Sequence, residues 1–352
     1  MSLTVEIGTV DAQQWHRLLQ GFDDASIFQT WAYGAARWGE NNLGHAVIRD
    51  GGEVVGLAQA ALMGIPLFGK ILAYVTFGPV CHRRGAAGGM EQLKGTIDAL
   101  REEYVVRRRL CLRLRPWAYD LPADARAALL TDGVWEEARP LHTTFILDLS
   151  LPESRLRSAM DKKWRANLRK AEQCGLTVSR HDGSDGIPLF LDLHRQMRER
   201  KHLAAEFGVM LPTLFELLPE QLQPRIFVCW RNRVPVAAAI VSAIGDRAFY
   251  LNGASGDAAL EVRGGYFLQW AIVRWLKENG RCRWYDLHGT ASSPGVRQFK
   301  RGLVGARAPE IPLNELEARG RHLSALMVGA GTRLFEVHRK LKGAWAGPSR
   351  RG

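Results

Sequence analysis

The chain has 352 residues, of which 46% are hydrophobic and 24% charged, and its formal net charge is +12. This length suggests about two domains, and the hydrophobic content excludes a disordered chain. The excess of positive charge favours polyanionic partners such as nucleic acid, phosphorylated substrates or anionic lipid.

The cysteines and the N-terminus bear on the compartment. Five cysteines are widely spaced, with neither a CxxC pair nor metal-ligand spacing, which is typical of thiols in a reducing cytosol. The N-terminus lacks the basic and apolar regions of a signal peptide. The long apolar span 54–80 is interrupted by Gln59, Pro66 and Lys70, which favours two strands and a loop over a membrane helix. We therefore predict a cytoplasmic protein without a metal site.

The first half of the chain predicts alternating helices and strands. Asp11 begins a helix over 11–20, and Thr30 can cap a second helix that places Tyr33 and Arg37 on one face. Residues 50–52 are typical of a hairpin turn. The remaining expected elements are strands at 46–49, 54–62, 71–77, 110–114 and 143–149, and helices at 91–107 and 123–130.

The second half opens with a basic helix predicted over 156–174 and ended by Gly175. Its cations, among them Lys163 and Arg165, form either a solvated face or a ridge that faces phosphate groups. A helix that carries Arg200 follows. The remaining expected elements are strands at 226–230, 236–243, 248–251 and 283–287, and helices at 264–278 and 323–341.

The order of these elements repeats. The strand and turn at 47–52 correspond to those at 228–233, and helix 91–107 with strand 110–114 corresponds to helix 265–278 with strand 283–287. Two copies of one strand-hairpin-strand-helix-strand unit are the simplest account, which makes each copy α/β or α+β.

One strand end in the second copy carries polar groups. Asp286 and His288 end the strand at 284–287, and Lys300 follows a loop and Phe299. Catalytic groups often lie on such loops. The alternative is an ordinary strand end, in which Asp286 caps a turn and Lys300 is solvated.

Motif searches narrow the chemistry. The chain has no P-loop, HExxH, GxSxG or GxGxxG, and the one phosphate-friendly feature is Gly264-Gly265 at a helix start, preceded by Arg263. This pattern indicates group transfer from a phosphate-bearing donor. Acyl transfer requires a proton acceptor and a cation at the developing oxyanion, and Asp286 or His288 can serve as the first and Lys300 as the second.

Several stretches, taken in order, resemble motifs of the Fem-type peptidyltransferases. They are Gln29-Thr30-x-x-Tyr33 with Arg37, Tyr74-Val75-x-x-Gly78-Pro79-Val80, the basic run from Lys162 to Ala171 before Gly175, Arg198 to Lys201, Tyr250-x-x-Gly253-Ala254-Ser255, Leu268-x-Trp270, Tyr285-Asp286-x-x-Gly289, and Phe299-Lys300. Each motif is loose, but their joint occurrence over most of the chain is fairly specific.

The resemblance implies an α/β (mixed α+β) fold of two tandem acetyltransferase-like (GNAT-like) domains without a coiled-coil arm. The first domain, 1–149, would bind the acceptor and be joined by a C-terminal helix at 320–345. The second, 150–310, would hold the donor and the catalytic groups. The implied reaction moves an amino acid from aminoacyl-tRNA to an amine of a peptidoglycan stem peptide, with no cofactor.

The resemblance also assigns roles to residues. Lys300 would lie at the donor carbonyl or tRNA end, and Arg37 and Arg200 would hold acceptor phosphates. We predict a catalytic set of Lys300, Asp286 and His288; a substrate-binding set of Arg37, Tyr33, Arg200, Lys163, Arg165, Tyr250, Asn252 and Ser255; and a donor-phosphate set of Arg263, Gly264 and Gly265.

Two departures leave alternatives open. His288 stands where the family often has a small residue, and no helical arm is visible, so the donor and the acceptor stay undetermined. The first alternative is an acyl-CoA-dependent N-acyltransferase acting on an exopolysaccharide, sugar or lipid precursor; the second is a non-enzymatic RNA-binding protein. The expected acceptor is a nucleotide-sugar peptide or a lipid-linked precursor. We expect a monomer that contacts the inner membrane face peripherally if the acceptor is lipid-linked.

Overall fold

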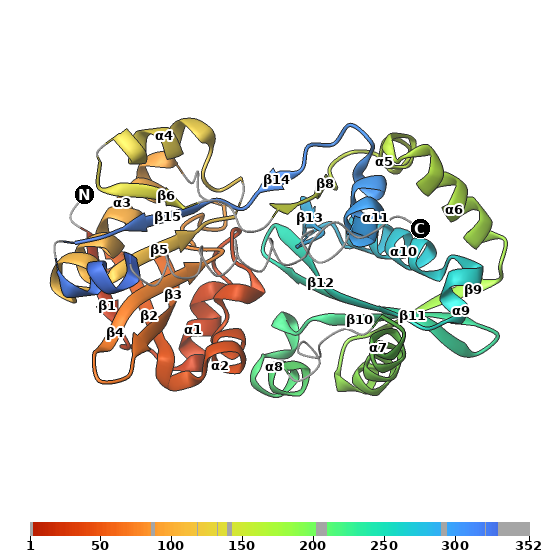
Figure 1. Ribbon diagram of the computed structural model, residues 1–352, viewed down its shortest axis with the longest axis horizontal. Helices are drawn as coiled ribbons and strands as arrows, with labels where there is room; N and C mark the ends of the chain where they lie inside the picture. Colours follow the sequence, from red (N-terminus) through yellow and green to blue (C-terminus); the bar gives the residue numbers. More distant parts are fainter. Residues whose placement is uncertain are drawn as a thin grey trace, which may run out of the picture.

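The computed structural model describes residues 3–85, 89–117, 119–131, 133–138, 143–201, 210–289, 294–320 and 322–329. Within them the chain forms two large sheets that lie side by side, each flanked by helices (Figure 1). No helix in these ranges is long and apolar enough to cross a membrane.

The first unit is built on a seven-stranded sheet of order β1-β2-β3-β4-β5-β15-β6. Its strands are β1 (Leu3–Ile7), β2 (Leu43–Asp50), β3 (Glu53–Ile65), β4 (Gly69–Thr76), β5 (Cys111–Arg115), β15 (Glu315–Ala318) and β6 (Trp135–Ala138). Its helices are α1 (Ala12–Leu19), α2 (Trp31–Trp38), α3 (Met90–Arg101) and α4 (Ala123–Thr131). Asp11 and Thr30 cap α1 and α2 through their side chains, as the sequence predicts.

The second unit is built on a six-stranded sheet of order β8-β13-β12-β11-β10-β9. Its strands are β8 (Ile146–Asp148), β13 (Trp284–Asp286), β12 (Arg247–Ser255), β11 (Val234–Ile244), β10 (Arg225–Arg231) and β9 (Leu176–His181). Its helices are α5 (Glu153–Ala159), α6 (Lys162–Glu172), α7 (Ile187–Lys201), α8 (Leu211–Leu217), α9 (Ala258–Val262), α10 (Gly264–Asn279) and α11 (Pro294–Val304). Helices α7 and α8 lie on one face of the sheet, and α10 and α11 on the other (Figure 1).

The two sheets repeat one topology, which confirms the expected tandem fold. In each, a run of antiparallel strands ends in one parallel pair, β4 with β5 in the first sheet and β12 with β13 in the second. The strand beyond that pair, β15 or β8, is again antiparallel.

The chain crosses between the units more often than expected. Strand β8 follows the first unit in the sequence but pairs with β13 of the second sheet. Strand β15 follows the second unit but lies between β5 and β6 of the first sheet. A short pair, β7 (Thr143–Thr144) with β14 (Ile311–Pro312), links the two crossings (Figure 1). The sheets therefore do not divide at the predicted boundary between residues 149 and 150.

The predicted C-terminal helix is described only in part. Residues 323–329 are helical and pack through Val328 on Ile71 and Leu72 of the first sheet; residues 321 and 330–345 lie outside the described residues.

The predicted helix at 156–174 is instead two helices. Met160 is extended, with ψ of 149°, and the Asp161 side chain accepts the Lys163 backbone N–H at 2.8 Å. Asp161 therefore acts as an N-cap and restarts the helix as α6, a local hydrogen bond that outweighs the continuous apolar pattern.

A shared hydrophobic core joins the two units. Phe28 and Phe77 of the first unit stack with ring centroids 4.3 Å apart, and Phe249 of the second packs edge-on to Phe28 at 5.0 Å. Ile146 and Leu214 of the second unit belong to the same cluster. We call this contact region between the two units the joint. Burial of its aromatic rings stabilises the joint without polar specificity.

Candidate functional site

The end of β13 carries the predicted polar group Asp286, which is fully buried. Its oxygens accept hydrogen bonds from Trp117 Nε1 at 2.8 Å, from the His288 backbone N–H at 2.7 Å and from Thr144 Oγ1. Burial raises the pKa of Asp286, and the Thr144 and Trp117 hydrogen bonds oppose that rise. The carboxylate is thus occupied in holding the loop that contains His288, whose φ is 46°.

Lys300 lies on α11 and is only 7% exposed. Its ammonium donates to the carbonyl oxygens of His288 and, at 2.7 Å, of Gly289, and it lies 5.4 Å from the centroid of the Tyr250 ring. Burial lowers the pKa of Lys300 to about 8, and the Asp286 charge opposes this shift. Among the described residues, two carbonyls accept from the three ammonium N–H groups, which leaves one N–H group there to donate to a substrate.

A groove of about 670 Å³ runs along the first unit and ends at His288 and Gly289. We call it the sheet-1 groove. It is lined by Phe28, Tyr33, Arg37, Trp38, Leu43, Gln59, Ala61, Met63, Leu72, Tyr74, Thr76, Arg113, Arg115, His288, Gly289, Leu313 and Glu315. Both predicted acceptor-side residues of the first unit, Tyr33 and Arg37, therefore lie in one cavity with His288.

A second cavity of about 550 Å³ lies within the second unit, and we call it the sheet-2 cavity. Its walls are mostly apolar and aromatic. Among the predicted residues it is lined by Tyr250, Ser255, Arg263, Gly265 and Lys300. Gly265 belongs to the first turn of α10, where backbone N–H groups and the helix dipole favour an anion.

The two cavities converge on Lys300. The side chain lines the sheet-2 cavity, while the two residues whose carbonyls it binds, His288 and Gly289, line the sheet-1 groove.

Not every predicted residue joins this arrangement. Arg200 binds Asp257 and, at 2.8 Å, the Ser255 carbonyl, so it lies in the second unit and apart from Arg37. Asn252 accepts the Gly253 backbone N–H at 2.8 Å. Arg165 donates to the Ser158 carbonyl.

Two further predicted residues take separate positions. Lys163 lines a third cavity of about 360 Å³ together with Arg301. Gly264 is the first residue of α10. A Cβ added at this position would lie 3.2 Å from the Val236 side chain, so the small size of glycine allows the helix to pack closely.

Arg113 and Arg115, with Tyr74 and Glu315, were missed as candidate site residues. Arg115 is mostly buried in the sheet-1 groove, 5.6 Å from the centroid of the Tyr74 ring, and its buried Nε has no hydrogen-bond partner in the part of the chain that the structure describes. Tyr74 donates to Glu315 at 2.6 Å. The two arginines alternate with Leu112 and Leu114, and this period of two could have identified a polar face of that strand.

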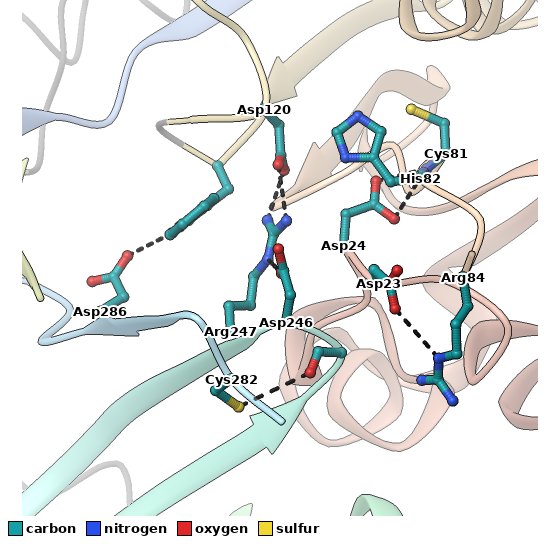
Figure 2. Close-up of polar contacts among 12 residues, drawn as sticks. Asp23, Asp24, Cys81, His82, Arg84, Asp120, Asp246, Arg247, Cys282 and Asp286 are labelled. Carbon is teal, nitrogen blue, oxygen red and sulfur yellow. Dashed lines mark hydrogen bonds and ion pairs between the residues drawn. The ribbon is translucent and has the colours of Figure 1, made fainter. Parts of the chain in front are cut away.

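Arg247 and Asp120 form a buried ion pair near the candidate site (Figure 2). Arg247 is 2% exposed and donates to both oxygens of Asp120 at 2.8 and 2.9 Å, and its guanidinium lies 4.2 Å from the centroid of the Trp117 ring. Burial by itself lowers the pKa of Arg247, but the Asp120 carboxylate outweighs this effect and raises the pKa above its ordinary value. Trp117 in turn binds Asp286, so the joint between the units is connected to the loop of His288.

The described residues offer one possible metal-ligand group, Asp24 with Cys81 and His82 (Figure 2). The Asp24 oxygens already accept the backbone N–H groups of Cys81 at 2.7 Å and His82 at 3.0 Å. Burial raises the pKa of the Cys81 thiol, which disfavours the thiolate that a metal requires. We therefore assign Asp24 a structural role at the joint.

Comparisons with known proteins agree with this architecture. Residues 158–301 match the family described as acetyltransferase (GNAT) domain. A search of curated protein sequences finds no match.

Solved structures resemble the chain over most of its length. A crystal structure of FemX has a TM-score of 0.71 at 15% identity and covers 89% of this chain and 96% of its own. L-PGS from Bacillus licheniformis has a TM-score of 0.54 at 13% identity, with 90% and 95% covered. The C-terminal domain of a putative lysylphosphatidylglycerol synthetase from Agrobacterium fabrum has a TM-score of 0.50 at 15% identity, with 79% and 85% covered. The chain thus has a tandem GNAT fold like that of FemX, and the match to the acetyltransferase (GNAT) domain lies in its second unit.

Proposed function

We propose that the protein transfers an aminoacyl group from aminoacyl-tRNA to an amine of a peptidoglycan-precursor stem peptide. The convergence of the sheet-1 groove and the sheet-2 cavity on Lys300 carries this assignment. The acceptor occupies the groove, where Arg37 and Arg115 provide cations for its phosphates. The donor occupies the cavity, with its ester carbonyl at Lys300.

The reaction forms an amide bond and breaks an ester bond. The acceptor amine attacks the ester carbonyl, and the remaining N–H of the Lys300 ammonium stabilises the oxyanion. Collapse of the intermediate expels the ribose oxygen, which takes up one proton to become a hydroxyl, while the amine loses one proton to His288 or water. Asp286 acts as a positioning residue because its oxygens are engaged by Trp117, Thr144 and the His288 N–H.

Acyl-CoA is the second candidate donor. The sheet-2 cavity lies in the unit that matches the acetyltransferase domain, and it reaches Arg263 and Gly265 at the start of α10. These groups suit a pyrophosphate as well as they suit the end of a tRNA.

Product mass distinguishes the two donors. The purified protein is incubated with charged tRNA or acetyl-CoA and with nucleotide-sugar or lipid-linked peptide acceptors. A product heavier by one amino-acid residue supports the proposal, and an acetylated product with acyl-CoA alone overturns it in favour of the alternative.

The pH dependence of the rate tests Lys300. A required ammonium is present below its pKa and lost above it, so wild-type kcat should fall as pH rises through about 8. Lys300→Ala should lower kcat by about 10²–10³-fold. Lys300→Arg should retain part of the rate and lose the fall near pH 8, because arginine stays protonated. An unchanged rate in Lys300→Ala would exclude the role.

A further inference from the structure

The turn between β3 and β4 exposes consecutive apolar side chains. Ile65 is 40% exposed, Leu67 102% and Phe68 58%, with Pro66 between them. Single exposed apolar residues are common, but a contiguous group marks an interaction site. Leu67 also has a φ of 72°, a conformation that favours glycine. The exposed leucine in a left-handed conformation is a local outlier and motivates a search for a function of its side chain.

Further apolar side chains lie at the same edge of the first sheet. Val328 packs on Ile71 and Leu72 just after the turn, and this brings the helical residues 323–329 to the start of β4. Leu323 and Leu326 of that segment are 60% and 73% exposed. The edge is therefore apolar over two segments that are distant in sequence.

Cations flank this apolar edge. Lys70 follows the turn, and because β5 runs parallel to β4 with Leu72 opposite Cys111, the run Arg107-Arg108-Arg109 lies at the same end of the sheet. Glu102 and Glu103 pair with Arg107 and Arg108. The surface thus combines exposed apolar tips with an excess of positive charge, a combination that suits anionic lipid.

The edge is continuous with the candidate site. A shallow groove of about 530 Å³ is lined by residues 61–66 together with Trp38, Asn42, Gly69 and Lys70. It shares Trp38, Ala61 and Met63 with the sheet-1 groove, which ends at His288. The groove beside the β3–β4 turn therefore adjoins the sheet-1 groove.

We propose that the β3–β4 turn docks this protein on an anionic lipid bilayer, with Leu67 and Phe68 inserted among the headgroups and Lys70 and Arg109 facing lipid phosphates. The sheet-1 groove then opens toward the membrane surface. If the proposed function holds, on which this step rests, the acceptor is a lipid-linked precursor that enters the groove from the bilayer.

Vesicle co-sedimentation tests the docking. The full chain is mixed with vesicles of phosphatidylcholine alone or with 30 mol% phosphatidylglycerol, a composition chosen at roughly the anionic content that recruits basic surfaces. Wild type should bind the anionic vesicles at least tenfold better. Leu67→Ser/Phe68→Ser should bind the anionic vesicles at least tenfold more weakly. Lys70→Glu/Arg109→Glu should also bind more weakly, and its difference from wild type should shrink as salt is added.

A matched control uses exposed apolar residues elsewhere. Leu217 on α8 and Val234 at the β10–β11 turn are 46% and 56% exposed. Leu217→Ser/Val234→Ser should leave vesicle binding unchanged; equal losses in both double variants would overturn the proposal.

Two further measurements separate the competing outcomes. If Leu67→Ser/Phe68→Ser abolishes a concentration-dependent dimer in sedimentation velocity without vesicles, the turn is a self-association surface and the membrane proposal is wrong. Transfer to a soluble acceptor should be unchanged in this variant, whereas transfer to a vesicle-embedded acceptor should fall at least tenfold. If the wild-type protein transfers to neither acceptor, the proposed function is wrong. The vesicle-binding result then decides the docking proposal by itself.

Discussion

Corresponding turns in the two units have different surroundings. The β11–β12 turn of the second unit, Gly245-Asp246, packs on the first unit, where the Asp246 N–H donates to the Asp23 carbonyl at 2.6 Å. The β3–β4 turn of the first unit, three residues long, projects Leu67 and Phe68 into solvent. One topological position thus forms the joint in one copy and an apolar surface in the other.

The difference follows from what comes next on the chain. Arg247 begins β12 directly after the tight turn and forms the buried pair with Asp120 of the first unit. The corresponding strand β4 begins with Gly69 and Lys70, which are exposed. A repeated fold therefore fixes where a turn lies, while its length and the adjacent residues determine what it contacts.

Breaking the joint should have the largest effect. Arg247→Met leaves Asp120 buried and unpaired, and we expect the free energy of unfolding to fall by about 3–5 kcal/mol in urea titrations. Arg84 also pairs across this region with Asp23, at 3.3 Å, but is exposed (Figure 2). Arg84→Met should change stability by less than about 1 kcal/mol; an equal loss in both variants would contradict a special role for the buried pair.

Alanine at the turn glycines compares the two positions directly. Gly245 has a φ of 65° and a Cβ there would collide with the Asp23 carbonyl, so Gly245→Ala should destabilise by about 2–4 kcal/mol. Gly69 has a φ of 74° with open space around it, so Gly69→Ala should cost only about 1–2 kcal/mol of backbone strain. Thermal unfolding of the two variants checks the difference.

The connection from the joint to the site is tested at Trp117. Trp117→Phe keeps a ring beside Arg247 but removes the hydrogen bond to Asp286, and we expect a stability loss of about 1–3 kcal/mol together with a lower kcat. Trp230→Phe, which removes the 2.7 Å bond to Ser179 far from the site, serves as the control. If both variants lower kcat equally, the connection has no functional role.

Removing the exposed side chains should have the smallest effect on folding. Leu67→Ser/Phe68→Ser should change the free energy of unfolding by no more than about 0.5 kcal/mol, because neither side chain packs in the core. A loss above 2 kcal/mol would show that the turn is structural rather than a docking surface.

The repeat and most strands could be predicted because hydrophobic patterning and turn residues are local signals. The structure brings Lys300, His288 and Asp286 into contact, because one strand end and the following helix carry them, and their catalytic roles stay predictions. The placement of β8 and β15 was missed because strand exchange depends on pairing partners far apart in sequence. Arg200 and Arg37 were grouped by resemblance; the structure places Arg37 in the sheet-1 groove and pairs Arg200 with Asp257. Trp117 gave no local signal, since its importance arises from Arg247 and Asp286 meeting it in space.

The position of β15 has a consequence for synthesis of the chain. Residues 315–318 supply an inner strand of the first sheet, between β5 and β6, but are translated after the whole second unit. The nascent first unit therefore emerges from the ribosome with β5 unpaired on one side, an open edge that invites intermolecular pairing. A chain cut after residue 310 would keep that edge permanently, so the N-terminal half should need the rest of the chain, or a chaperone, to stay monomeric.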